Sequence, residues 1–314
     1  MNHVDKLKKK LNLSSTLALE PAPHEEAPPE EQNKDIIINL LMHYFCPNYR
    51  LKNEGRIAVC FTGQIRTGIE VAPMMKQFFG KMDDQLDFFI YTWDTESFSP
   101  WAGHRKNINS ELIIDQLIPI NPNKIEKIKQ IYNPISMVVD NLSEYRRTHP
   151  NGVENRAGIY NTIPPRWISA YECNKLRKKY ELLCGNQYRL VLRIRFDVIF
   201  TTNYTLIKEV QYMQGNPNAL YSVDRHNRFH EAVEDIAWLA PGNIIDKAID
   251  FALHREENTS KIDEYQDFRQ YLIENQIHTR PFKNNDVYLY RDFDIENNLS
   301  PFDKPLNNDE TTLE

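Results

Sequence analysis

The run Arg193-Ile-Arg195-Phe-Asp197 places three charged residues at alternate positions, at the end of the apolar segment 188–194. Alternate residues of a strand lie on one face, so these three side chains share a face of the predicted strand. Charged groups are rarely buried without partners. Arg193, Arg195 and Asp197 therefore form either an internal ion network or the surroundings of an anionic ligand, with or without a metal. We favour the ligand.

A second candidate is the turn Thr62-Gly63-Gln64-Ile-Arg66-Thr-Gly68, which follows the apolar segment 56–62 and precedes a predicted helix. In such a turn, backbone N–H groups and a helix N-terminus can face an anion, and a guanidinium can fork onto a phosphate. The turn is neither a Walker loop nor a G-x-G-x-x-G motif. The alternative is a tight turn with a solvated arginine.

Two further segments carry groups that could do chemistry. Trp93-Asp94 ends the apolar segment 86–92, where a base could stack on the indole, or where Trp93 is core and Asp94 caps the next helix. Glu234-Asp235 precedes the apolar segment 236–239. This acidic pair could supply a general base for a hydroxyl nucleophile, or could simply cap or solvate the boundary.

The elements that must position these residues alternate between apolar, β-branched runs and longer amphipathic segments. This alternation predicts an α/β domain with mostly parallel strands, covered by helices on both faces. Ligands bind at the carboxyl ends of the strands in such sheets. The expected strands are 56–62, 86–92, 135–139, 188–194, 219–223 and 236–239, and the expected helices are 67–80, 109–117, 123–131, 165–184, 242–254 and 262–275.

The composition excludes several classes of protein. The chain has 314 residues with a net charge of −6, which leaves no general basic surface for nucleic acid. The mean hydropathy is −0.60, and the longest apolar stretches are too short to cross a membrane. Four cysteines without C-x-x-C spacing argue against a zinc site or a disulfide scaffold. We expect a cytoplasmic protein.

Residues 1–34 differ in composition from the rest of the chain. A basic start leads into a segment rich in Pro and Glu, which cannot bury enough apolar surface to offset its ordering entropy. We expect a flexible extension, with either a frayed helix or a weak peripheral membrane contact at its beginning. We expect residues 35–314 to form the folded domain, with a nucleotide half at about 55–200 and an acceptor half at about 201–314.

Four segments together resemble a known family: Cys60–Arg66, Phe88–Asp94, the helical stretch Ser169–Glu181, and Tyr188–Asp197. They are similar to the SGQ-x-R, HTWD and VIR-x-R-x-D motifs of bacterial and large-virus glycosyltransferases of surface polysaccharide synthesis. These enzymes resemble GT-A nucleotide-diphospho-sugar transferases. The likeness covers about residues 55–280.

The resemblance implies a nucleotide-sugar donor, a glycan or glycolipid acceptor, and hexosyl or related transfer. Inversion and retention both stay open, and we favour inversion. It places Gly63, Gln64 and Arg66 beside the diphosphate. It places Trp93 and Asp94 beside the nucleoside. Arg193 and Arg195 would serve the leaving group. The pair Glu234 and Asp235 resembles the acidic pair of inverting enzymes, and Asp235 is the expected base if the enzyme inverts.

The resemblance also implies Mn²⁺ or Mg²⁺ at Asp197, where GT-A enzymes have D-x-D. This chain has R-x-D instead, and one carboxylate is a poor site for a hard cation. Either the diphosphate and water complete the coordination, or the arginines act without metal. We expect the literal Asp292-Phe-Asp294 to be a surface turn. The rival functions are a non-catalytic nucleotide- or glycan-binding module of a polysaccharide assembly complex, and a transferase with a donor other than a sugar.

Overall fold

The computed structural model describes residues 55–97, 117–148, 165–185, 187–200, 204–223, 233–257, 264–283 and 287–289. The N-terminal extension and the Asp292-Phe-Asp294 sequence lie outside these ranges. All the described residues belong to the unit Met42–Glu314.

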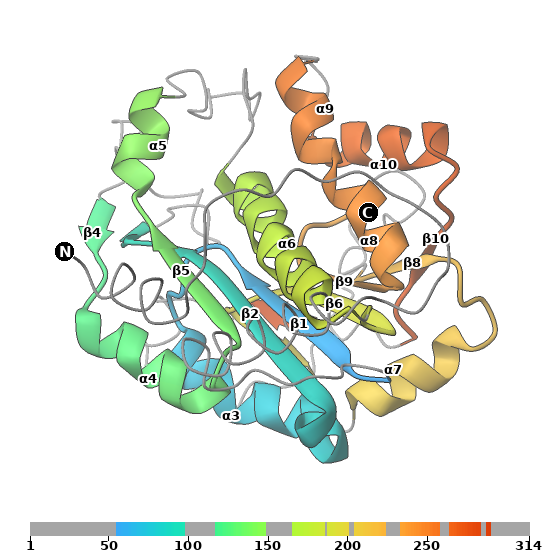
Figure 1. The fold of residues 1–314 in the computed structure, drawn as a ribbon, viewed down its shortest axis with the longest axis horizontal. Helices are drawn as coiled ribbons and strands as arrows, with labels where there is room; N and C mark the ends of the chain where they lie inside the picture. The colour runs from blue at the N-terminus through green and yellow to red at the C-terminus, as the bar shows by residue number, and fades with distance from the viewer. Residues whose placement is uncertain are drawn as a thin grey trace, which may run out of the picture. The chain divides into compact units, whose positions relative to one another are not determined.

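A seven-stranded sheet forms the centre of this unit (Figure 1). Its order is β10 (Thr279–Pro281), β8 (Leu220–Ser222), β9 (Ala237–Ala240), β6 (Leu190–Arg195), β1 (Ile57–Thr62), β2 (Leu86–Trp93) and β5 (Ser136–Asp140). β1 pairs in parallel with β2 and β6, and β2 pairs in parallel with β5. Only β9 is antiparallel to its neighbours, β6 and β8. The expected mostly parallel α/β sheet is confirmed.

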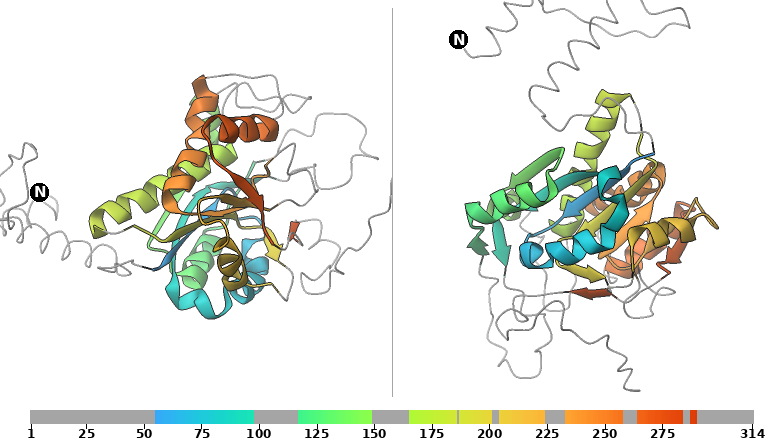
Figure 2. Two further views of the ribbon diagram at one scale, coloured as in Figure 1. Left: turned by 90° about the vertical axis from the view of Figure 1, so that its right-hand side faces the viewer. Right: turned by 90° about the horizontal axis from the view of Figure 1, so that it is seen from below.

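Helices cover both faces of the sheet (Figure 2). Along β1, Ile57, Val59 and Phe61 belong to one hydrophobic cluster, which also holds residues of α3 (Gly68–Phe79), α4 (Pro122–Tyr132) and α7 (Leu206–Met213). Ala58 and Cys60 belong to a second cluster, which holds residues of α6 (Pro165–Cys184), α8 (Gly242–Ile249), α9 (Phe251–Glu257) and α10 (Glu264–Glu274). Alternate side chains of β1 thus point to opposite faces of the sheet, and each face has its own hydrophobic core.

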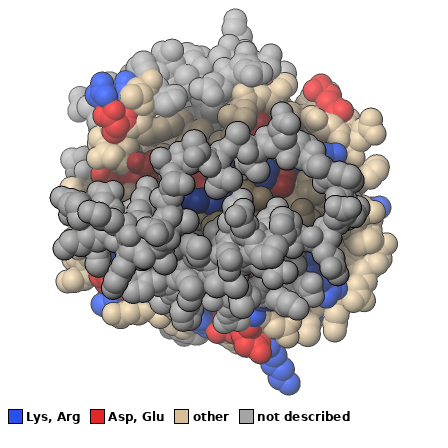
Figure 3. Space-filling view, viewed as in Figure 1, with Lys and Arg blue, Asp and Glu red and all other residues tan. Residues whose placement is uncertain are grey.

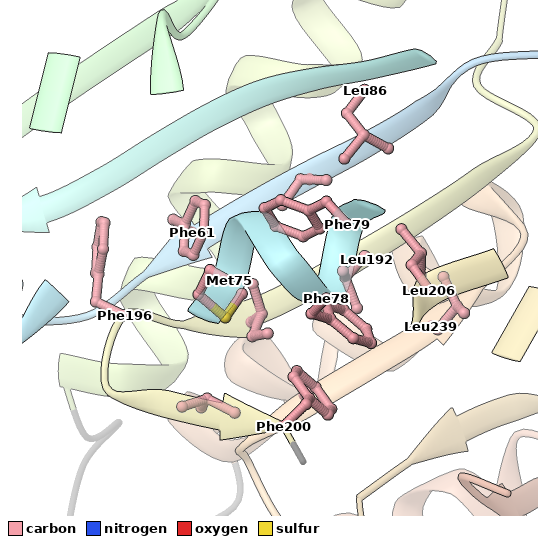
Figure 4. Close-up of a cluster of buried hydrophobic side chains, with 14 of the residues drawn as sticks. Phe61, Met75, Phe78, Phe79, Leu86, Leu192, Phe196, Phe200, Leu206 and Leu239 are labelled. Carbon is pink, nitrogen blue, oxygen red and sulfur yellow. The ribbon is translucent and has the colours of Figure 1, made fainter. Parts of the chain in front are cut away.

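The first cluster is rich in aromatic rings (Figure 4). Phe61 stacks on Phe196 at 4.9 Å between ring centroids, and Phe78 stacks on Phe200 at 3.9 Å. Phe196 lies between Arg195 and Asp197, so this packing fixes the backbone that carries both charges.

Several elements lack a sequence prediction because they are short. They are the 3₁₀ helix η1 (Gly80–Gln85), β3 (Thr95–Ser97), β4 (Leu117–Pro119), α5 (Leu142–Thr148), α7, β7 (Val198–Phe200), β10 and β11 (Val287–Leu289). The expected helix at 242–254 is two helices that meet at Asp250. The expected helix at 109–117 is wrong at Leu117, which begins β4, and its other residues lie outside the described ranges. In the part of the chain that the structure describes, no helix is long and apolar enough to cross a membrane.

Candidate functional site

The carboxyl ends of β1, β2, β5 and β6 meet at one edge of the sheet, because these strands are parallel. β9 is antiparallel to β6 and therefore begins at this edge, directly after Glu234-Asp235. The topology thus brings the predicted turn, the charged end of β6 and the acidic pair together. This edge is the candidate site.

Asp197 lies at the centre of the first ion cluster. Its two carboxylate oxygens accept hydrogen bonds from Arg195 Nε at 3.0 Å and Arg195 Nη2 at 2.9 Å. Arg66 Nη1 lies 3.7 Å from Asp197 Oδ2, and Arg66 Nε donates to Gln64 Oε1 at 3.1 Å. The turn after β1 and the end of β6 are therefore joined by charge.

Asp235 is the centre of a second cluster that shares Arg195. Arg195 Nη1 lies 3.7 Å from Asp235 Oδ1, and Arg166 Nε lies 3.8 Å from Oδ2. The Tyr265 hydroxyl donates to Oδ1 at 3.1 Å, and Arg193 donates to the backbone carbonyl of Asp235. Arg166 also lies over the Tyr265 ring, at 5.5 Å from its centroid.

Arg166 and Tyr265 are site residues that sequence reasoning missed. They lie in the first turns of α6 and α10, far from β6 in sequence. The one local signal is Pro164-Pro165, which marks a helix start just before Arg166. Nothing in the sequence indicates that the two helix starts meet at Asp235.

The ion pairs set the protonation of Asp235. Burial by itself would raise the pKa of this carboxyl, but Arg195, Arg166 and Arg193 outweigh burial and bring its pKa to about 2. Efficient general bases have pKa values near the working pH. A carboxylate with so low a pKa is a weak proton acceptor, so the geometry argues against Asp235 as the base.

Arg193 is buried, with 1% of its surface exposed. Its guanidinium stacks over Trp238 at 4.6 Å, and burial lowers its pKa to about 10 although Asp235 acts against this effect. Its Nε has no hydrogen-bond partner among the described residues. Arg193 is thus buried against Trp238 and the Asp235 carbonyl in this structure, and its contact with a donor stays a prediction.

Arg195 differs from Arg193. Burial would lower its pKa, but Asp197 and Asp235 outweigh burial and raise the pKa above its usual value. Four arginines (66, 166, 193 and 195) surround Asp197 and Asp235. Among the described residues, Asp94 and Asp140 at the neighbouring strand ends add two further carboxylates to this edge. Figure 3 shows charged side chains of both signs within a recess on the face viewed in Figure 1.

The two glycines of the turn have different tasks. Gly63 has φ +93°, a conformation that side chains rarely adopt, and nothing lies within 4 Å of the position of a Cβ. Gly68 allows a close approach instead, because a Cβ there would lie 3.1 Å from Phe196 Cβ. Gly63 therefore allows the backbone conformation of the turn. Gly68 allows α3 to pack closely against Phe196 at the end of β6.

Trp93 and Asp94 take the structural alternative at the end of β2. Trp93 is 1% exposed and packs against Tyr91 and Tyr145. Asp94 Oδ1 accepts from the backbone N–H of Leu142 at 3.0 Å, which caps α5. Trp93 is thus buried in this structure, and its contact with a nucleoside stays a prediction.

The metal expected at Asp197 does not fit the residues around it. Both Asp197 oxygens accept hydrogen bonds from Arg195, and Asp235 is held by its own set of cations and by Tyr265. Within the described ranges, no three His, Cys, Asp or Glu side chains gather in a way that could hold a metal. A hard divalent cation needs several available oxygens.

Comparisons with known proteins do not establish a family. No family model matches the sequence, and no curated protein matches it. The fold is similar to the glycosyltransferase GlyE of Streptococcus pneumoniae TIGR4 in its apo form, at 12% identity and a TM-score of 0.36 over 72% of this chain. The alignment spans 44% of GlyE, so this chain matches less than half of that protein.

Two further solved structures are similar at the same level. The galactosyltransferase LgtC, in complex with donor and acceptor sugar analogues, aligns at 12% identity and a TM-score of 0.37, over 71% of this chain and 72% of LgtC. A cytidylyltransferase from Leptospira borgpetersenii serovar Hardjo-bovis aligns at 12% identity and a TM-score of 0.34, over 75% of this chain and 79% of that chain. At these identities, the likenesses concern the fold alone and establish no activity for this chain.

Proposed function

We propose that this protein is a glycosyltransferase, which moves a sugar from a nucleotide-activated donor to a hydroxyl group of a glycan or glycolipid. The observation that carries this proposal is the cluster of guanidiniums at the ends of β1 and β6, where Arg66, Arg166 and Arg195 lie around two buried aspartates. Ligands bind at this edge in open α/β sheets, and a phosphate matches the geometry of a guanidinium fork. The motif resemblance supports the same donor class.

In the proposed reaction, the acceptor oxygen forms a bond to the anomeric carbon of the sugar. The bond from that carbon to the diphosphate oxygen breaks, and the electron pair stays with the diphosphate. The leaving group therefore gains negative charge in the transition state. Arg66, Arg166 and Arg195 stabilise this charge, and fixed cations are effective because they need no reorganisation.

The proton of the acceptor hydroxyl needs a base if the reaction inverts. Asp235 is held by Arg195, Arg166 and Tyr265, whereas the neighbouring Glu234 is partly exposed. We assign the base to Glu234 and give Asp235 the task of holding the arginines in place. General bases contribute roughly 10²- to 10⁴-fold to rate, so Glu234→Gln should lower turnover by that order.

One observation favours a second candidate, a nucleotide- or glycan-binding module without catalysis. Two acidic residues of the predicted site, Asp197 and Asp235, are held in ion pairs with arginine. A protein that only binds an anionic ligand needs no base at all. The two candidates differ in turnover and share donor binding.

The test is a screen of nucleotide sugars of the uridine, guanosine, cytidine and thymidine series with purified protein. Chromatography follows release of the nucleoside phosphate, with and without a hydroxylated acceptor, and calorimetry follows binding. A transferase releases nucleotide faster with acceptor present, and Arg66→Gln lowers that rate, while Arg189→Gln at the opposite end of β6 does not. Binding without turnover would establish the module, and absence of any binding would refute both candidates.

A further inference from the structure

The ions at the candidate site are arranged with their cations outward. The side chains of Arg66, Arg195 and Arg166 are 15%, 20% and 30% exposed, whereas their partners Asp197 and Asp235 are 2% and 4% exposed. A solute that reaches the ends of β1 and β6 therefore meets these guanidinium groups before Asp197 and Asp235, and the exposed Asp140 lies at the end of β5. An anion is attracted there, and a divalent cation is repelled by the same groups.

Several carboxylate oxygens at this edge accept hydrogen bonds from the protein, while Asp235 Oδ2 has no hydrogen-bond partner among the described residues and lies 3.8 Å from Arg166 Nε. Asp197 accepts two hydrogen bonds from Arg195, and Asp235 accepts one from Tyr265. At the neighbouring strand ends, Asp94 caps the helix α5, and Asp140 accepts hydrogen bonds from the Tyr91 hydroxyl and the Asn141 backbone. A metal would have to displace these donors to find the several oxygens that it needs.

Arg195 keeps capacity for another acceptor while it holds Asp197. A guanidinium has five N–H donors, and Arg195 uses two of them on Asp197. Its Nη1 lies 3.7 Å from Asp235 Oδ1, beyond hydrogen-bond distance. Asp197 therefore fixes the plane of the Arg195 guanidinium. The other N–H groups of Arg195 are left to donate to a ligand.

We infer that this edge binds the diphosphate of a nucleotide through guanidiniums alone, with Asp197 and Asp235 as fixed counter-anions and without a divalent cation. This inference rests on the proposed function for the identity of the donor class. It assigns to Arg166 a ligand contact beside those of Arg66 and Arg195. Asp197 and Asp235 are then positioning residues, which orient the arginines and do not touch the ligand.

A site made of guanidiniums and a site with a metal bridge differ in how Mg²⁺ changes the affinity for a diphosphate. Mg²⁺ binds diphosphates in solution and lowers their negative charge, so it weakens their attraction to a cluster of fixed cations. In a site that uses a metal bridge, the same ion strengthens binding. The effect of Mg²⁺ on affinity therefore separates the two arrangements.

The experiment is calorimetric titration of the full-length protein with inorganic pyrophosphate, once in EDTA and once in excess Mg²⁺. We expect binding in EDTA and equal or weaker binding in Mg²⁺. Arg66→Gln and Arg166→Gln should each weaken binding in EDTA by about tenfold or more, because each removes a charge-assisted contact. Arg189→Gln, an exposed arginine at the start of β6, is the matched control and should bind like the wild type.

Melting temperatures of all variants show whether each one is folded, and Arg66→Lys and Arg166→Lys replace any glutamine variant that is not. Binding that requires Mg²⁺, or that is unchanged in both site variants, would overturn the inference and leave a metal-dependent transferase open. Binding in EDTA without transfer of any donor sugar would uphold the inference and establish the binding module. No binding under either condition would overturn both the inference and the proposed function.

Discussion

Asp235 is held at the sheet edge by a hydrogen bond from Tyr265 and by Arg195 and Arg166 at 3.7 and 3.8 Å. A buried carboxylate of this kind has a clear energetic role. Removal of one partner of a buried ion pair leaves the other charges uncompensated, which typically costs ~3–5 kcal/mol. The residue therefore contributes to stability in a way that a solvent-exposed base would not.

We predict that Asp235→Asn lowers the free energy of unfolding by about 3 kcal/mol at pH 7. The folded pKa of about 2 lies below the unfolded value, so the contribution of Asp235 is present above about pH 4 and is lost as pH falls toward 2. The difference in melting temperature between wild type and variant should therefore shrink below pH 4. Glu234→Gln is the control, with a small change in melting temperature.

An unchanged melting temperature in Asp235→Asn, together with a turnover lowered 100-fold or more, would contradict this account. That result would return the base to Asp235, as the sequence resemblance implies. Equal stability and equal turnover would show that neither task belongs to this residue.

At the scale of elements, the long periodic segments were predictable. The expected helix at 165–184 coincides with α6, and the expected strand at 86–92 with all but the last residue of β2. The alternation Arg193, Arg195, Asp197 left an ion network and an anionic ligand open; the structure has ion pairs from Arg195 to Asp197 and Asp235, and the favoured ligand stays a prediction. Arg166 and Tyr265 were not predictable, because their meeting depends on the tertiary placement of two helix starts.

Trp93 shows why a strand pattern can leave two alternatives open. Its place at the end of a strand suits either base stacking or a core position, and the strand pattern alone does not separate the two. The packing of Tyr145 from α5 against its ring places Trp93 in the core of this structure, and α5 has no clear sequence signal.

We predict that Gly68→Ala destabilises the protein by ~1–3 kcal/mol and weakens donor binding. The new methyl group would lie 3.1 Å from Phe196 Cβ, so α3 or the segment between Arg195 and Asp197 must shift. Thermal melts and donor titrations test this change. Gly215→Ala is the matched control, because its Cβ would meet only Tyr212 O at 3.7 Å and should have little effect.

The helix α7 carries a buried carboxylate with a pH-dependent cost. Burial raises the pKa of Glu209 to about 7, although the backbone N–H of Lys283 donates to it. For a raised pKa, the contribution to stability is full below the unfolded value of about 4.3 and is lost as pH rises through 7. Above that pH, the folded state must hold a buried charge.

Accordingly, Glu209→Gln should stabilise the protein at pH 8 by about 3 kcal/mol relative to wild type, and the gain should vanish near pH 4. Glutamine keeps an acceptor for the Lys283 N–H and has no charge to bury. Denaturant unfolding at both pH values measures the change. A variant that is equally destabilised at both pH values would show that the ionised carboxylate is needed in the folded state.

At the scale of the whole molecule, the net charge is negative, whereas arginines gather at the candidate site. The chain carries a net charge of −6, yet Arg66, Arg166 and Arg195 gather at the ends of β1 and β6. Salt screens exposed charges beyond about 10 Å at 0.1 M, so an anionic donor experiences mainly the local field of the arginines. Because β9 is antiparallel to β6, Asp235 lies at the same edge of the sheet as the arginine at the end of β6.

The central claim is that this edge binds the diphosphate of a nucleotide-activated donor. The most direct measurement is a crystal structure of the protein with a nucleoside diphosphate, chosen by the donor screen and soaked in the presence of EDTA. We predict diphosphate oxygens within hydrogen-bond distance of Arg195 and of Arg66 or Arg166, at the carboxyl ends of β1 and β6. A diphosphate bound elsewhere, or bound at this edge only through a metal ion on Asp197, would contradict the claim.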